Sequence, residues 1–123
     1  MGDCPVGARE PGVRPRQHLL HLGVSEMFLN HQLRLDLTDD QTAALRHRRT
    51  EARTAWMDAE AAVARLEREL WILTATAPLD VDAVASKVEA IADLRARQRL
   101  DYILAVRAAA ETLSEAQQAR LTR

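Results

Sequence analysis

The sequence predicts an all-α protein built on a long antiparallel helical hairpin, with a shorter helix before it and a short helix after it. The stretch from Thr38 to Ala77 contains neither Pro nor Gly and is rich in the helix formers Ala, Arg, Glu and Leu. Pro78 then marks a turn, and a second helical stretch follows it. In the first stretch, apolar residues recur mostly at alternating steps of four and three, which indicates one continuous helical seam: Leu45, Ala52, Trp56, Ala59, Val63, Leu66, Leu70 and Leu73.

Length and composition limit the class of protein. The 123 residues suit one domain, and the net charge of -1 argues against a nucleic-acid partner. Of the seventeen cationic residues only Lys87 is a lysine, as Arg- and Ala-rich helices from high-GC coding often show. Aromatic residues make up only 3% of the chain, so Leu, Val, Ile and Ala must form the core. That composition favours helix-on-helix packing.

The first fifteen residues are predicted to be a disordered leader, ahead of a single helical domain over 16–123. They hold three of the four prolines and three of the four glycines and show no periodicity. Cys4 is the only cysteine, which leaves a lipid-attachment residue, an intermolecular bridge or no role. No apolar run is long enough for a signal peptide or a membrane span. We therefore expect either a cytoplasmic protein or a chain whose export signal has been removed.

A first helix is predicted from Arg16 to Leu35, with Pro15 near its first turn. Gly23 weakens this helix and is a candidate kink. On a helical wheel one face gathers the residues expected to point into the core, namely Leu20, Val24, Met27, Phe28, His31 and Leu35.

The second helix starts at a capping signal. Thr38 can cap the helix, Asp39 and Asp40 suit the positive end of its dipole, and Gln41 occupies the capping-box position. The helix is expected to end near Ala77. A short link capped by Asp80 or Asp82 then returns the chain antiparallel to it.

The third helix is predicted from Val81 to Thr112. Arg95 and Gln98 interrupt its predicted seam, which consists of Val84, Val88, Ile91, Tyr102, Ala105, Ala109 and Leu113. A second, offset stripe contains Leu94, Leu100, Ile103 and Leu104. One hairpin partner cannot cover both stripes, so we expect the first helix and a second subunit to pack there, giving a homodimer. Ser114 is then the predicted cap of a last helix ending near Leu121.

The start signal occurs twice, as Leu37-Thr38-x-x-Gln41 and as Leu113-Ser114-x-x-Gln117. Over roughly Arg16 to Leu121 the chain thus resembles the LTxxQ family of bacterial periplasmic proteins, which contains the Spy and CpxP envelope-stress proteins, the zinc-resistance-associated protein and the CnrX-type nickel and cobalt sensors. The resemblance implies an all-α, cradle-like dimer exported to the periplasm. Members bind unfolded proteins, sense metal, or restrain a sensor kinase or sigma-factor system. This chain departs from the pattern in lacking an export signal and in having Ser114 for Thr, which keeps the capping hydroxyl.

Catalysis finds no support, because no nucleophile with its base and no glycine-rich phosphate loop can be nominated. Metal binding is the sharper hypothesis, with zinc, nickel, cobalt or copper as the ion and five candidate ligands: His18, His21, Met27, His31 and His47. The pair His18 and His21 lies about 130° around the helix from the pair Met27 and His31, so one straight helix cannot join them. Met27 and His31 also lie on the predicted core face. We therefore favour the first pair, with Glu51, His47 or a subunit mate.

A CnrX-type resemblance would imply a metal site in this chain made of a His-x-x-x-His pair on the first helix, a Glu from the second helix, and His and Met near the last helix. Here the first pair has the wrong spacing, and no His or Met follows Met57. That site is not carried over.

Two arginine groups and one tryptophan are candidates for a partner or client surface. The first group is Arg46, Arg48, Arg49 and Arg53, and the second is Arg95, Arg97 and Arg99. They form either a solvated face paired with Glu51 and other helix carboxylates or a cationic surface for acidic clients or a sensor domain. Trp71 lies beside the seam and is expected to be partly exposed. With it, the predicted partner surface contains Arg46, Arg49, Leu100 and Leu104.

The sequence thus predicts a non-enzymatic, dimeric, periplasmic protein of the envelope-stress or heavy-metal response. It would bind metal ions, unfolded protein, or a regulatory partner such as a membrane sensor or anti-sigma protein. The alternative is a cytoplasmic structural or adaptor module without a ligand.

Overall fold

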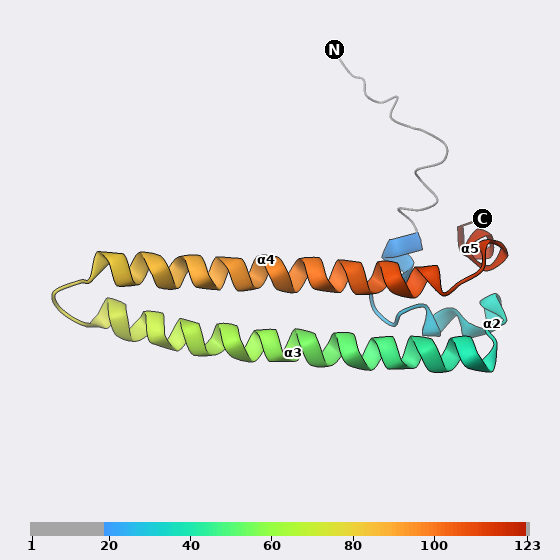
Figure 1. Cartoon of the computed structure of the whole chain (residues 1–123), viewed down its shortest axis with the longest axis horizontal. Coiled ribbons are helices and arrows are strands. Elements are labelled where there is room, and N and C mark those ends of the chain that lie inside the picture. The colour runs from blue at the N-terminus through green and yellow to red at the C-terminus, as the bar shows by residue number, and fades with distance from the viewer. Residues whose placement is uncertain (1–18, 123) are drawn as a thin grey trace, which may run out of the picture. The chain divides into compact units, whose positions relative to one another are not determined.

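The computed structural model describes residues 19–122, which are helical apart from their connecting turns and contain no strand (Figure 1). Residues 19–23 form a helical turn, and the elements after it are η2 (Leu29–His31), α2 (Gln32–Leu35), α3 (Asp39–Ala75), α4 (Val81–Glu111) and α5 (Glu115–Thr122). Two compact units result. Among the described residues, the terminal unit consists of 19–50 with 104–122, and the hairpin unit is Glu51–Ile103.

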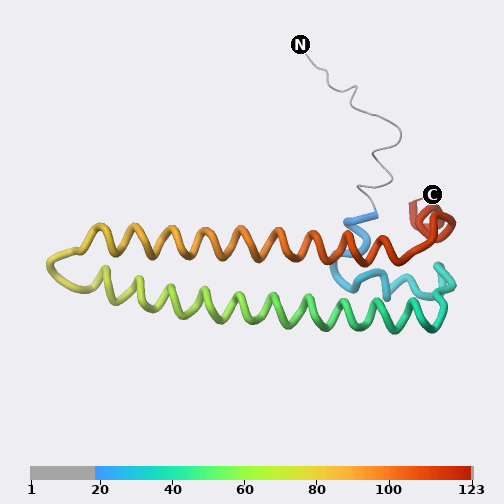
Figure 2. The backbone as a smooth tube through the Cα atoms, viewed as in Figure 1, coloured from blue at the N-terminus to red at the C-terminus, as the bar shows by residue number. Residues whose placement is uncertain are grey.

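The two long helices confirm the predicted all-α hairpin. Figure 2 follows the chain along α3, through the turn after Ala75 and back along α4. At this turn the backbone N–H of Ala83 donates to Asp80 Oδ1 at 3.1 Å, so Asp80, the first of the two predicted candidates, caps α4. For α3, α4 and α5 the predicted helix boundaries agree with the observed ones to within two residues.

Both start signals form complete capping boxes in the terminal unit. The backbone N–H of Thr38 donates to Gln41 Oε1 at 3.0 Å, and the N–H of Gln41 donates to Thr38 Oγ1 at 3.0 Å. At the start of α5, the N–H of Ser114 donates to Gln117 Oε1 at 2.8 Å and the N–H of Gln117 donates to Ser114 Oγ at 3.1 Å. Each box satisfies N–H groups that a helix start leaves without partners.

The two capping glutamines also bind each other. Gln41 Nε2 donates to Gln117 Oε1 at 2.8 Å, and Gln117 Nε2 donates to Gln41 Oε1 at 2.9 Å. The second hydrogen of each amide goes to a backbone carbonyl, that of Thr112 for Gln41 and that of Leu35 for Gln117. Every donor and acceptor site of this glutamine pair is therefore used. The pair ties the start of α3 to the start of α5.

The predicted continuous first helix, Arg16–Leu35, is wrong. The helical turn stops at Gly23, and Met27 and Phe28 adopt left-handed backbone angles, with φ of 51° and 68°. This turn lets two adjacent side chains both point inward, since Met27 and Phe28 are almost completely buried. A straight helix would place them about 100° apart. The Phe28 ring covers Gly23 so closely that a Cβ there would lie 2.3 Å from Phe28 Cζ.

The break also changes which residues form the core. Val24, expected on the buried face, is exposed, whereas Met27, Phe28 and Leu35 are buried as predicted. The buried apolar residues that complete the terminal unit are Leu19, Leu45, Val106, Ala109, Ala110, Leu113 and Leu121. The predicted leader, with Cys4, and the candidate ligand His18 lie outside the described residues.

Candidate binding surface of the hairpin unit

The hairpin unit has a thin core. Of the predicted α3 seam residues that belong to this unit, only Ala52 and Val63 are buried. The remaining seam residues of this unit are half-buried, except for the more exposed Trp56. Each helix has a single neighbour within the unit, and one neighbour cannot enclose a side chain on all sides. Apolar surface therefore stays in contact with solvent.

The seam of α4 follows the predicted line with one exception: the half-buried predicted residues are Val84, Ile91, Tyr102 and Ala105, and the buried ones are Ala109 and Leu113. Val88 is 49% exposed, whereas Leu94 is half-buried and Gln98 is only 6% exposed. The prediction of Val88 as a seam residue was wrong, because this side chain is exposed and the neighbouring Lys87, which is half-buried, reaches across to Glu69 on α3. At Gln98, where the prediction placed an interruption, a polar side chain continues the seam. The structure accepts a polar residue there by satisfying its hydrogen bonds.

A polar node formed by Gln98, Glu60 and Arg95 fills the middle of the hairpin unit. Gln98 Nε2 donates to the Trp56 carbonyl at 3.1 Å and to Glu60 Oε2 at 2.9 Å, and Arg95 donates to the same oxygen at 2.7 Å. The hydrogen bond from Gln98, followed by that from Arg95 and its charge, lowers the pKa of Glu60 below its ordinary value, against an opposing desolvation effect. Beside the node the rings of Trp56 and Tyr102 meet edge to face, with centroids 5.6 Å apart.

One side of the hairpin unit is apolar on both helices. At 100° per residue, Met57, Ala64 and Trp71 lie roughly 130–140° around the axis of α3 from the α3 seam. The apolar residues of α4 that are named below lie roughly 95–155° around the axis of α4 from the α4 seam, in the same rotational sense. Equal rotational offsets on antiparallel helices point to the same side of the pair. The contacts between Trp56 and Tyr102 and between Glu60 and Arg95 lie on this same side of the two seams. We define the apolar face as Trp56, Met57, Ala64, Trp71, Val81, Ala85, Val88, Ala92 and Ile103.

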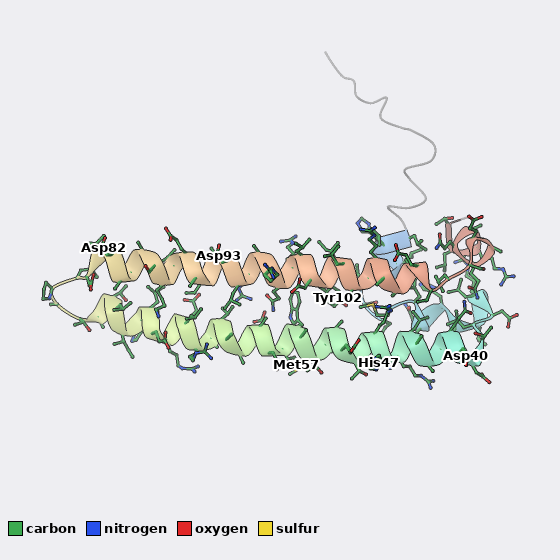
Figure 3. The ribbon with its side chains drawn as sticks, in the orientation of Figure 1. Asp40, His47, Met57, Asp82, Asp93 and Tyr102 are labelled. Atoms are coloured by element: carbon green, nitrogen blue, oxygen red, sulfur yellow. The ribbon has the colours of Figure 1, made fainter. Side chains whose placement is uncertain are left out.

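Large side chains on the apolar face are well exposed. Trp71 is 74% exposed, Met57 69% and Val81 66%. Figure 3 shows Met57 on α3, directed away from α4, and Tyr102 directed toward α3. A run of exposed apolar groups of this kind is typical of an interaction surface.

The opposite side of the hairpin unit is charged. By the same wheel it carries Glu51, Asp58, Arg65, Glu69, Asp93, Arg97 and Asp101. Near this side Lys87 Nζ binds Glu69 Oε1 at 2.6 Å, and the hydrogen bond and charge of Lys87 lower the pKa of Glu69. Ile72, which is 62% exposed, is the large apolar exception on this side of α3. The hairpin unit is therefore amphipathic across its thickness.

The predicted partner residues fall in different places. Trp71 is exposed as expected and belongs to the apolar face. Leu100 and Leu104 are about half exposed, but the wheel places both away from the apolar face. Arg46 and Arg49 lie in the terminal unit, where Arg49 binds Glu26 Oε1 at 2.9 Å.

The three candidate histidines within residues 19–122, namely His21, His31 and His47, are not gathered into one group. His21 and His47 are exposed, His31 is half-buried, and Met27 belongs to the core. Residues 19–122 contain no group of three or more His, Cys, Asp or Glu side chains arranged to hold a metal ion. Because His18 lies outside the described residues, the site on His18 and His21 stays a prediction. Over the same range, none of the helices is both long and apolar enough to span a bilayer.

Sequence reasoning singled out Trp71 and Ile103 but missed the face that they share. Its signal was present, because Met57, Ala64 and Trp71 recur at intervals of seven residues, and so do Val81 and Val88. Recognising it required the seam of each helix to be placed correctly. Assigning Val88 to the seam concealed its place beside Val81 and Ala85 on the apolar face.

Comparison with known proteins adds no assignment: no protein-family model, curated protein or solved structure matches this chain.

Proposed function

We propose that this protein is a non-enzymatic binding protein of the envelope-stress or heavy-metal response, and that its apolar face holds unfolded polypeptide. The observation that carries the proposal is the position of both tryptophans and Met57 on one exposed side of a thin hairpin. Large aromatic side chains supply much of the binding energy at protein interfaces. Methionine adapts to partners of varied shape.

The chemistry of the apolar face suits an extended chain with mixed side chains. Arg53 and Arg99 lie within or beside it by the helical wheel, and the Glu60–Arg95 pair crosses it. A client segment that alternates apolar and acidic residues would therefore find contacts for both. Alanines at positions 64, 85 and 92 keep the middle of the face low, so a backbone can approach the helices closely.

The homodimer and the periplasmic location belong to the same proposal. The location rests on the resemblance of the two capping boxes to the LTxxQ pattern, and the homodimer rests on that resemblance and on the apolar surface that one hairpin partner leaves uncovered. The competing function is a cytoplasmic structural or adaptor module. In that case the apolar face would be permanently covered by a fixed partner and would not exchange clients.

The proposal is tested with two neighbouring substitutions. Trp71→Glu and Ile72→Glu place the same charge at adjacent exposed positions of α3, the first on the apolar face and the second on the charged side. Binding of a reduced, alkylated polypeptide that contains no tryptophan would be measured by fluorescence anisotropy of a dye on the client. Trp71→Glu should weaken binding by about tenfold or more, because loss of an aromatic anchor at an interface commonly costs about 2 kcal/mol.

Ile72→Glu should leave the affinity within about twofold of the unmodified protein, since rim or off-site positions contribute little. Equal loss in both variants would contradict the proposal, because it would show that charge or stability, and not the apolar face, controls binding. Absence of client binding by the unmodified protein would also refute it.

A further inference from the structure

The terminal unit has a polar hollow that the apolar face does not include. Its volume is about 280 Å³, and its lining residues are Glu26, Leu29, Asn30, Gln32, Arg46 and Arg49. They come from the turn that breaks the predicted first helix, from η2 and α2, and from the second and third turns of α3. The broken first helix therefore creates this hollow, and a straight helix would not.

Two arginines one helical turn apart provide the positive side of the hollow. Arg49 is fixed by the 2.9 Å contact with Glu26, and about 29% of its side chain is exposed. Arg46 occupies the neighbouring position on the same face of α3 and is exposed. Within residues 19–122 no ion pair involves Arg46. Its guanidinium is thus available to a ligand while Arg49 is already oriented.

The turn that carries the opposite wall is firmly anchored. Met27 and Phe28 both have positive φ, and both side chains are buried in the core. Anchoring at these two positions holds Glu26 on one side and Asn30 on the other in place above α3. The wall is therefore formed before any ligand arrives, which lowers the entropic cost of binding.

The balance of donors and charges defines the ligand. Two guanidinium groups and the carboxamides of Asn30 and Gln32 offer hydrogen-bond donors, whereas the only acidic group, Glu26, is bound to Arg49. The net charge of these side chains is +1. A planar carboxylate matches the guanidinium fork and carries one negative charge. A phosphate dianion would bring greater charge close to Glu26.

We propose that this arginine hollow is a binding site for a carboxylate group, with Arg46 as its main charged contact. Its volume lies at the small end of the range for ligand pockets, so it accommodates one acidic group with a short apolar stem against Leu29. Two sources share this chemistry, a small free dicarboxylic acid and an acidic side chain of a polypeptide. The site is independent of the apolar face, so either assignment can fail without the other.

The test is an NMR titration of the ¹⁵N-labelled full chain with glutarate and, separately, with a short glutamate-rich peptide with blocked ends. The side-chain amide signals of Asn30 and Gln32 should shift saturably, whereas that of Gln118, which is bonded to Ala110 and Leu113 in another part of the terminal unit, should not. Saturation by the peptide at lower concentration would identify a polypeptide as the source. Saturation by glutarate alone would identify a free acid.

Arg46→Gln should weaken binding by about tenfold or more, since it removes a charge-assisted contact and leaves Arg49 and Glu26 paired. Arg48→Gln is the matched control, because it removes the same charge two residues away, outside the hollow. Equal weakening by both substitutions, equal affinity for inorganic phosphate, or no saturable shift with either ligand would overturn the proposal. Unfolding of Arg46→Gln would be visible in its backbone spectrum. In that event the titration is repeated with Arg46→Lys, which keeps the charge but lacks the planar fork, and an affinity equal to that of the unmodified protein would overturn the proposal.

Discussion

Gly23 provides the sharpest test of local packing at the scale of single residues. A methyl group at this position would lie 2.3 Å from Phe28 Cζ, and the ring is completely buried. Because the ring has no free space to move into, we expect Gly23→Ala to reduce the free energy of unfolding by about 1–3 kcal/mol in urea denaturation. The same change should cost less in a Phe28→Leu background. If Gly23→Ala instead raised the free energy of unfolding, as replacement of Gly by Ala does in an exposed helix, this packing would be contradicted.

The glutamine pair leads to a second prediction. Gln41→Glu removes the two amide donors that reach Gln117 Oε1 and the Thr112 carbonyl, and it places a carboxylate against that oxygen. Leaving partly buried acceptors without donors should cost about 2 kcal/mol or more. Thermal or urea unfolding at neutral pH measures this loss. Gln32→Glu makes the same chemical change at an exposed position of α2 and should have little effect on stability, so a similar loss in both would argue against the pair.

Some of this residue-scale detail could be predicted and some could not. The capping box of Thr38 and Gln41 could be predicted because its two partners are only three residues apart in the sequence. The bonding of Gln41 to Gln117 depends on how distant segments meet, and no local spacing encodes it. Gly23 was recognised as a weak point of the helix. That Phe28 folds back over it depends on the burial of two adjacent side chains, which helical periodicity alone does not anticipate.

The polar node leads to a pH-dependence prediction at the scale of elements. The pKa of Glu60 is lower in the folded chain than its ordinary value of 4.5, so its contribution to stability is complete above that pH and is lost as the pH falls through the lowered value. Glu60→Gln should therefore flatten the fall in urea midpoint between about pH 5 and pH 3. Glu67→Gln, an exposed change on the same helix, is the control. If the urea midpoint of Glu60→Gln fell with pH as steeply as that of the unmodified protein, the polar node would not contribute to the pH dependence of stability.

The long helices were the most predictable elements. Thr38, Asp80 and Ser114 mark helix starts by local hydrogen bonding, and the prolonged three-and-four spacing leaves no other regular structure for α3. The position of the seam on α4 was less predictable. The prediction interrupted the seam at Gln98, because a buried glutamine resembles an interruption until its partners Glu60 and Trp56 are known.

The whole molecule presents more apolar surface than two helices can cover. The core of the terminal unit is closed by residues from both ends of the described chain, whereas the hairpin unit buries few side chains of its own. What covers the apolar face is a property of a partner, so neither the composition nor the helix periods of this chain could reveal it. A second copy and an unfolded client can be distinguished, because a second copy binds at a fixed stoichiometry and needs no added polypeptide.

Client binding by the apolar face can be followed by the fluorescence of Trp71 in a Trp56→Phe variant, as an unfolded polypeptide without tryptophan is added. We expect the emission of Trp71 to shift to shorter wavelengths and its quenching by acrylamide to decrease, because a residue that is 74% exposed becomes covered by the client. Sedimentation of the same samples reports whether a second copy already covers it. Emission that stays unchanged when the client is bound, or that is already shifted in a stable dimer and does not respond to the client, would show that the apolar face does not hold unfolded polypeptide.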